Sequence, residues 1–168
     1  MQRTRLLTSV AAAVALALVS ACGGDKSNQP SAKPTLSLTG RDTVSVGDTI
    51  VLAAVADFAT MPSETFGSAV YTVGWSDANA LSINSLTQTL GSNLRYALVG
   101  PSSIHLAASA PNNSAPTYTT ARVGWIVTSA AAGKTLTFSL TPTAIYGAHT
   151  FDSLLDKVAV GNKTVHVR

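Results

Sequence analysis

The chain has one cysteine, Cys22, and one glutamate, Glu64, among its 168 residues. A lone cysteine excludes a disulfide within the chain. Hydrolysis by paired carboxylates needs two poised acids, and the other acidic residues are aspartates that stand singly. Charged residues make up only 11% of the sequence and form no basic cluster, so nucleic acid is not an expected partner.

Metal and cofactor sites are not expected either. The histidines His105, His149 and His166 are far apart, and no two have a metal-ligand spacing such as His-x-x-x-His. Asp152 and Asp156 would meet on a helical turn and could help to hold calcium, but a solvated face is the simpler interpretation. There is no Gly-x-Ser-x-Gly motif and no phosphate-binding glycine loop, so we expect a protein without catalytic activity.

The amino-terminal segment has the features of a signal peptide, predicted over residues 1–21. Arg3 and Arg5 precede the run 6–19, which is apolar except for Thr8 and Ser9. This run is shorter than the roughly 20 residues of a transmembrane helix and suits the core of a signal peptide. Cleavage would remove both arginines and lower the formal net charge from +3 to about +1.

Residues 19–22 read Val-Ser-Ala-Cys. This tetrapeptide resembles the bacterial lipobox, in which the cysteine carries lipid and becomes the first residue of the mature chain. The resemblance implies a lipid anchor on Cys22 and, with Gly23 as the next residue, export to the outer membrane. Two or more acyl chains hold a protein stably at a membrane. The alternative is an ordinary secretory signal followed by a chance cysteine.

A linker follows the lipidated cysteine, so that residues 22–34 form the predicted tether. Residues 23–34 contain two prolines, no large apolar side chain and no periodic pattern. Such a segment cannot offset its ordering entropy by burial, and we expect it to be disordered. Twelve residues of flexible coil span about 20 Å on a root-mean-square average.

Residues 35–168 read as one all-β domain. Short runs alternate between apolar and polar residues and are separated by turn residues, as in an antiparallel β-sandwich. The run 49–58 is apolar on both faces, which predicts a strand covered on both sides. Residues 59–68 read as a loop, and 151–158 is ambiguous because its apolar residues have helical spacing. The expected strands are 36–38, 44–46, 49–58, 70–75, 81–86, 94–99, 104–108, 118–127, 135–140 and 164–167.

Several of these runs form an ordered set: Ser45–Leu52, Tyr71–Ile83, Ile104–Ser109, Lys134–Leu140 and Lys163–Val167. In order and spacing the set resembles the cohesin domain and its carbohydrate-binding sandwich relatives. It departs from that pattern at Ala78, where proline is usual, and at Trp75, which stands one place before the family's tyrosine. The resemblance implies a jelly-roll-like sandwich of about nine strands that binds a dockerin module or a glycan.

A bacterial Ig-like domain is the alternative, since it also opens with Val-x-x-Gly-Asp-x-x-x-Leu. It would make the protein a structural spacer or an adhesion domain of the cell envelope. Ig-like modules are usually shorter than residues 36–168, which favours the cohesin-like interpretation.

Four aromatic residues are candidates for stacking on sugar rings: Tyr71, Trp75, Tyr118 and Trp125. The alternative is that they pack in the core, because large aromatic side chains dominate the cores of sandwiches. Tyr71, Val73 and Trp75 share one face of a strand, and at least one such row must be buried. The sequence therefore predicts a module that binds a protein or a polysaccharide, without naming the contact residues.

Overall fold

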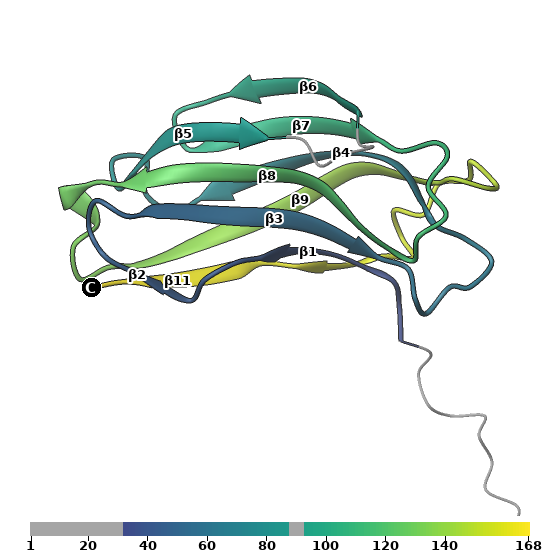
Figure 1. The fold of residues 1–168 in the computed structure, drawn as a ribbon, viewed down its shortest axis with the longest axis horizontal. Helices are drawn as coiled ribbons and strands as arrows, with labels where there is room; N and C mark the ends of the chain where they lie inside the picture. Colours follow the sequence, from purple (N-terminus) through teal and green to yellow (C-terminus); the bar gives the residue numbers. More distant parts are fainter. Residues whose placement is uncertain (1–31, 88–92) are drawn as a thin grey trace, which may run out of the picture. The chain divides into compact units, whose positions relative to one another are not determined.

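Two β-sheets packed face to face make up the described part of the chain (Figure 1). The computed structural model describes residues 32–87 and 93–168. Cys22, the predicted signal segment and the predicted linker as far as Ser31 lie outside the described residues. Within those ranges no helix has the length and apolar character needed to cross a membrane.

One sheet has five strands: β1 (Thr35–Thr39), β3 (Thr49–Asp57), β5 (Leu81–Thr87), β8 (Thr117–Val127) and β10 (Ala159–Gly161). The other has six: β2 (Thr43–Val44), β4 (Phe66–Trp75), β6 (Asn93–Val99), β7 (Ser103–Ser109), β9 (Thr135–Gly147) and β11 (Lys163–Val167). Their spatial orders are β10-β1-β3-β8-β5 and β2-β11-β9-β4-β7-β6. Neighbours are antiparallel except for β1 with β10 and β2 with β11, which are parallel.

The core lies between the sheets and follows from the alternation of side chains along each strand. In β9, Leu136, Phe138 and Leu140 are buried, whereas the alternating Thr135 and Thr137 are exposed. Both tryptophans meet in this layer. The ring of Trp125 lies 5.6 Å from that of Trp75 in an edge-on arrangement and 5.1 Å from that of Phe138. The predicted all-β sandwich is confirmed, with eleven strands instead of about nine.

Two strands are longer than the sequence predicts. The predicted strand 135–140 continues to Gly147 through Pro142, which a strand pattern normally excludes. The register between β4 and β9 shifts between Val70 and Tyr71, and Tyr71 pairs with Pro142, so the proline lies at a bulge, one of the places where a strand accepts proline. Strand β4 begins at Phe66, inside the predicted loop 59–68.

One ambiguous segment is settled and one prediction was wrong in detail. The segment 151–158, which the sequence left ambiguous, forms turns and one isolated bridge, with Leu154 and Val158 buried and Phe151 exposed. Strand β3 is not covered on both sides along its length, because Val51 is 47% exposed.

Candidate binding surface

Three of the four aromatic candidates for sugar stacking lie inside the core. Tyr71, Trp75 and Trp125 are 1%, 7% and 0% exposed, so none can stack on a ligand. The hydroxyl of Tyr71 lies 2.6 Å from the Thr120 hydroxyl, which itself donates to a backbone carbonyl of β3. Burial raises the pKa of Tyr71 to about 12, against the opposing effect of that hydrogen bond. The core-packing interpretation holds for these three residues.

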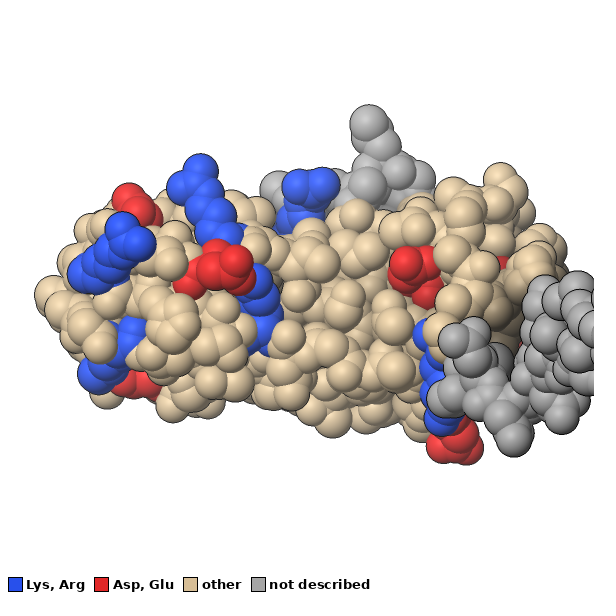
Figure 2. Space-filling view, turned by 90° about the horizontal axis from the view of Figure 1, so that it is seen from below, with Lys and Arg blue, Asp and Glu red and all other residues tan. Residues whose placement is uncertain are grey.

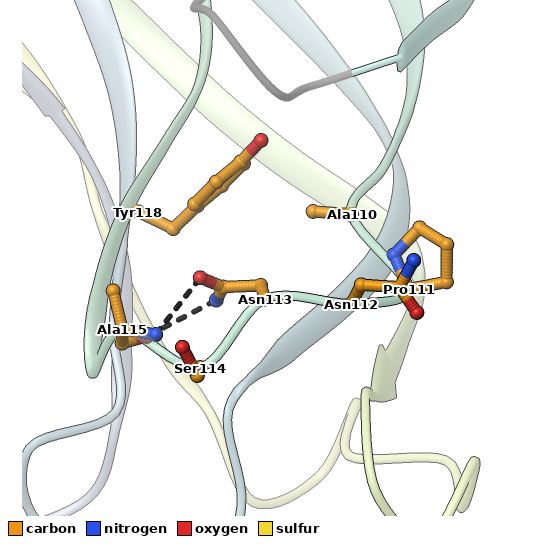
Figure 3. A pocket seen from close by; sticks show the side chains of 7 residues that line it. All are labelled: Ala110, Pro111, Asn112, Asn113, Ser114, Ala115 and Tyr118. Carbon is orange, nitrogen blue, oxygen red and sulfur yellow. Dashed lines mark hydrogen bonds between the residues drawn. The ribbon is translucent and has the colours of Figure 1, made fainter.

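Tyr118, the fourth candidate, is half-buried and borders a shallow hollow of about 400 Å³ (Figure 3). Its ring stacks on Phe66 with centroids 5.5 Å apart. The opposite wall is the loop 110–115, which is braced by Asn113. The side-chain amide of Asn113 donates to the carbonyls of Phe66 and Ala115 and accepts from the backbone N–H of Ala115. Its polar atoms therefore hold the loop in place by bonding to backbone groups.

The histidines lie where the alternation places them. His105 and His166 are exposed on the outer face of the six-stranded sheet. The Nδ1 atom of His105 lies 2.7 Å from the hydroxyl of Thr72, and that of His166 lies 2.9 Å from the hydroxyl of Thr135. Asp152 and Asp156 share no helical turn. The described residues contain no cluster of three or more metal-ligating side chains.

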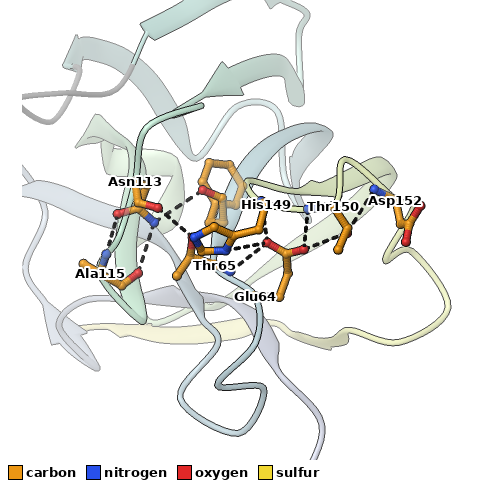
Figure 4. Close-up of polar contacts among 8 residues, drawn as sticks. Glu64, Thr65, Asn113, Ala115, His149, Thr150 and Asp152 are labelled. Atoms are coloured by element: carbon orange, nitrogen blue, oxygen red, sulfur yellow. Dashed lines mark hydrogen bonds and ion pairs between the residues drawn. The ribbon is translucent and has the colours of Figure 1, made fainter.

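The one glutamate has a role that the sequence did not reveal. Glu64 is 4% exposed and reaches from the β3–β4 loop to the segment after β9 (Figure 4). Its carboxylate accepts hydrogen bonds from the backbone of Thr65 at 3.0 Å and of His149 at 2.8 Å, and from the backbone and hydroxyl of Thr150 at 3.1 and 2.7 Å. Burial alone would raise the pKa of Glu64, but these donors outweigh it and lower the pKa to about 2.

The surface best suited to a partner is the outer face of β9, β4, β7 and β6, called the neutral face below. Strands β4, β7 and β9 contain no Asp, Glu, Lys or Arg, and Arg95 of the edge strand β6 is the one charged residue of the four. The face is made of polar and apolar side chains, most of them small. On its described part these include Ser68, Val70, Thr72, Leu98, His105, Ala107, Thr141, Ala144 and Tyr146.

An apolar row crosses the neutral face. Val70 pairs with Ala107 on one side and with Ala144 on the other, so three strands bring apolar side chains into line. Val70 is 45% exposed, and Leu98 and Tyr146 are exposed beside the row. Burial of such a row under a partner removes apolar area from water without stripping the solvent from a charged side chain.

The outer face of the five-stranded sheet differs in charge. It also exposes apolar side chains, Val51 and Ile126, but Arg122 stands beside them on β8 and Asp57 ends β3. Elsewhere most charged side chains gather toward one end of the domain. Figure 2 looks at the side that carries β1 and β11, and there blue and red atoms cluster mainly at the end where the chain terminates.

No protein-family model and no curated protein sequence matches the chain. Solved structures do match it. A non-cellulosomal cohesin from the hyperthermophilic archaeon Archaeoglobus fulgidus aligns with a TM-score of 0.66 at 20% sequence identity, covering 82% of this chain and 92% of the archaeal one. Residues 32–168, which form one compact unit, have a cohesin-like fold.

Two further cohesins support the same assignment. A cohesin module from a family 33 glycoside hydrolase of Clostridium perfringens has a TM-score of 0.67 at 13% identity, covering 81% of this chain and 97% of its own. A type III cohesin module from the ScaE cell-surface anchoring scaffoldin of Ruminococcus flavefaciens has a TM-score of 0.60 at 12% identity, with coverages of 81% and 88%. At these identities the likeness establishes the fold of the cohesin-like domain, and the resemblance seen in the sequence is confirmed at that level.

Proposed function

We propose that the cohesin-like domain is a non-catalytic module that binds a partner protein on its neutral face. The observation that carries the proposal is a sheet surface with exposed apolar side chains and no charge on three adjacent strands. The centres of protein interfaces are depleted of charged residues, because an imperfectly paired charge is costly to bury. The neutral face meets that requirement better than the face that carries Arg122.

A dockerin-like protein is the partner that this proposal favours over a glycan. One similar structure, with a TM-score of 0.58 at 14% identity, is a complex of CaDoc0917 with CaCohA2, a dockerin–cohesin pair. Protein sites for sugars usually offer exposed aromatic rings, whereas three of the four aromatic candidates in this chain are buried. Tyr146 is the one aromatic side chain of the described neutral face.

We further propose that lipid on Cys22 holds the domain at the cell envelope, at the outer membrane. The lipobox-like sequence and the linker-like composition of residues 23–34 support this location. The experiment is fractionation of cells that express the whole chain, with labelled fatty acid in the medium. The parent chain should carry label and sediment with membranes, and Cys22→Ser should do neither. Label on both proteins, or on neither, would exclude the anchor.

The binding face is tested with a matched pair of variants. Val70 and Val51 are 45% and 47% exposed at mid-strand positions on opposite faces of the sandwich. Each is replaced by arginine, and circular dichroism verifies that both variants fold. Binding to a panel of dockerin modules, and to proteins of an envelope extract, is then measured by surface plasmon resonance and by capture.

Val70→Arg should weaken binding at least ten-fold, whereas Val51→Arg should leave it within two-fold, because only the first places a charge in the interface. Equal effects of the two variants would contradict the assignment of the face. If the folded parent chain captures no partner under any condition, the spacer interpretation is the better one.

A further inference from the structure

An exposed aromatic residue stands at the tip of the segment after β9. Phe151 is 68% exposed, more than any other large hydrophobic side chain of the described residues. Its φ angle is 58°, and it is the one residue other than glycine with a positive φ in that part of the chain. The left-handed region is unfavourable for a side chain with a Cβ atom, so the fold maintains a strained, solvated phenylalanine.

The strain persists because the flanking residues are held firmly. The buried carboxylate of Glu64 binds the backbone of His149 and both the backbone and hydroxyl of Thr150, the two residues before Phe151. After it, the backbone of Asp152 donates to the Thr150 hydroxyl at 3.3 Å, and Ser153 bridges to Tyr146 of β9. The backbone of Phe151 is therefore held in a fixed position, so little conformational entropy of this segment should be lost when Phe151 binds a ligand or a surface.

This tip lies at the end of the domain where the chain enters. Pro34 accepts a hydrogen bond from the backbone of Ala159 at 2.8 Å, and β1 runs beside β10, so the segment 148–158 returns next to the entry point. Figure 1 shows both at the same end of the sandwich. Two other loops at this end, 58–65 and 110–116, contain one charged residue, the buried Glu64. The other charged residues near this end are Lys33 and Asp57, together with Asp152, Asp156 and Lys157 on the Phe151 segment.

We propose that Phe151 inserts into the headgroup–acyl boundary of the bilayer to which the chain is tethered, so that this end of the domain rests on the membrane. The proposal depends on the lipid anchor proposed at Cys22. A tether that spans about 20 Å keeps this end near the lipid. Burial of one phenylalanine then favours the inserted state roughly 10- to 100-fold, which is effective for a tethered group and negligible for a free protein.

The lipid surface that fits is a zwitterionic one. The Phe151 segment carries two aspartates and one lysine, so an anionic bilayer would add no attraction. Insertion at this end leaves both outer sheet faces, the neutral face included, exposed to the aqueous side. A domain that stands on its entry end can therefore hold a partner while remaining on the membrane.

The test measures partitioning of a singly acylated protein. The chain from Cys22 to Arg168 is coupled through its one thiol to a single myristoyl chain, which alone gives marginal, reversible binding to vesicles. Partition coefficients on phosphatidylcholine vesicles are compared for the parent protein, Phe151→Ser and Val51→Ser, after circular dichroism has verified folding. Phe151→Ser should lower the coefficient at least ten-fold. Val51→Ser removes a 47% exposed apolar side chain from the outer face of the five-stranded sheet and should change the coefficient less than two-fold.

A second measurement reads the depth of insertion. Both native tryptophans are buried, so Phe151→Trp introduces an exposed reporter. When the protein is coupled to vesicles, the emission of this tryptophan should shift to the blue and be quenched by brominated acyl chains, whereas the emission of Val51→Trp should do neither. Equal partitioning of Phe151→Ser and parent, or equal quenching of the two reporters, would overturn the proposal. Unchanged partitioning combined with loss of protein capture by Phe151→Ser would assign Phe151 to a protein partner and would overturn it as well. Chemical coupling makes these results independent of whether cells lipidate Cys22.

Discussion

The loops at the two ends of the sandwich are held in place by different kinds of contact. At the end where the chain terminates, exposed ion pairs join the turns: Lys134 binds Asp77 at 2.7 Å, and Lys163 binds Asp42. Asp48 and Asp77 also accept hydrogen bonds from the backbone N–H groups of Ser45 and Asn79, as aspartates in turns commonly do. At the end where the chain enters, one buried carboxylate, Glu64, collects donors from two loops.

The comparison shows that burial decides how much such contacts contribute to the free energy of unfolding. A solvated ion pair exchanges one set of good interactions for another and usually contributes less than about 1 kcal/mol. The Glu64 carboxylate is 4% exposed and its hydrogen bonds from His149 and Thr150 are partly buried, so loss of the carboxylate leaves partly buried N–H groups without their acceptor, at about 1–3 kcal/mol each. Substitutions that remove contacts at the charged end should therefore lower the stability of the fold less than substitution of Glu64.

The largest expected effect follows from removal of the buried acceptor. Glu64→Ala should lower the free energy of unfolding by about 3–4 kcal/mol, because the backbone donors of His149 and Thr150 lose their partner. Urea denaturation followed by tryptophan fluorescence measures the loss. Asp77→Ala at the opposite end is the control and should cause a much smaller loss, because the ion pair of Asp77 with Lys134 is exposed to solvent. Equal losses would remove the distinction between the two ends.

The second prediction concerns pH. The pKa of Glu64 is about 2 in the folded protein against an ordinary value of 4.5. A lowered folded-state pKa stabilises the fold fully above the ordinary value, and that contribution is lost as the pH falls from about 5 to 2. The loss should be roughly 2–3 kcal/mol. Denaturation at several pH values measures it.

Glu64→Gln isolates this contribution, since Asp42 and Asp77 also titrate in the acid range. The hydrogen bonds of Lys163 and Lys134 lower the pKa of these two exposed aspartates. The parent protein should be more stable than Glu64→Gln near pH 6, and the gap should close toward pH 2. A gap that stays constant would place the acid sensitivity at the charged end instead.

The third prediction concerns strain at the entry end. Phe151→Gly should stabilise the fold by about 0.5–1 kcal/mol, because glycine adopts a φ of 58° without a Cβ clash. Little packing is lost, since the ring is 68% exposed. Phe151→Ala keeps the Cβ atom and should give no gain. The comparison of melting temperatures by calorimetry checks both. A gain for alanine equal to that for glycine would mean that the ring, and not the backbone, is unfavourable.

The sequence predicted most of the strands because alternation is local. Strands β8 and β11 were found within one residue of their bounds, since each presents one face to the core. The far half of β9 was missed because Pro142 reads as a break, and only the pairing with Tyr71 on another strand makes it a bulge.

The hydrogen bonds of Glu64 at the entry end could not be predicted from the sequence, for a related reason. The donors to Glu64 lie at His149 and Thr150, some 85 residues along the chain, and no periodic pattern connects them. Composition singled out Glu64 as the one glutamate but gave it no partner. For the aromatics, alternation grouped Tyr71 with Trp75 correctly, yet which row faces the core depends on how the two sheets stack.

The smallest expected effect lies at the charged end. Lys134→Ala removes the ion pair between Lys134 and Asp77. The Lys134 side chain is 49% exposed, so the free energy of unfolding should change by less than about 0.5 kcal/mol. The difference should shrink further between 0.05 and 0.5 M salt, roughly as screening shortens the reach of the charges. The effect of Glu64→Ala should change less over the same range, because most contacts of this carboxylate are hydrogen bonds from backbone N–H groups, and the His149 ring at 3.2 Å is its one ionisable neighbour among the described residues. Salt titrations of both variants in urea therefore separate the two ways of holding a loop, and a salt-sensitive Glu64 would show that the entry end is fastened by surface electrostatics after all.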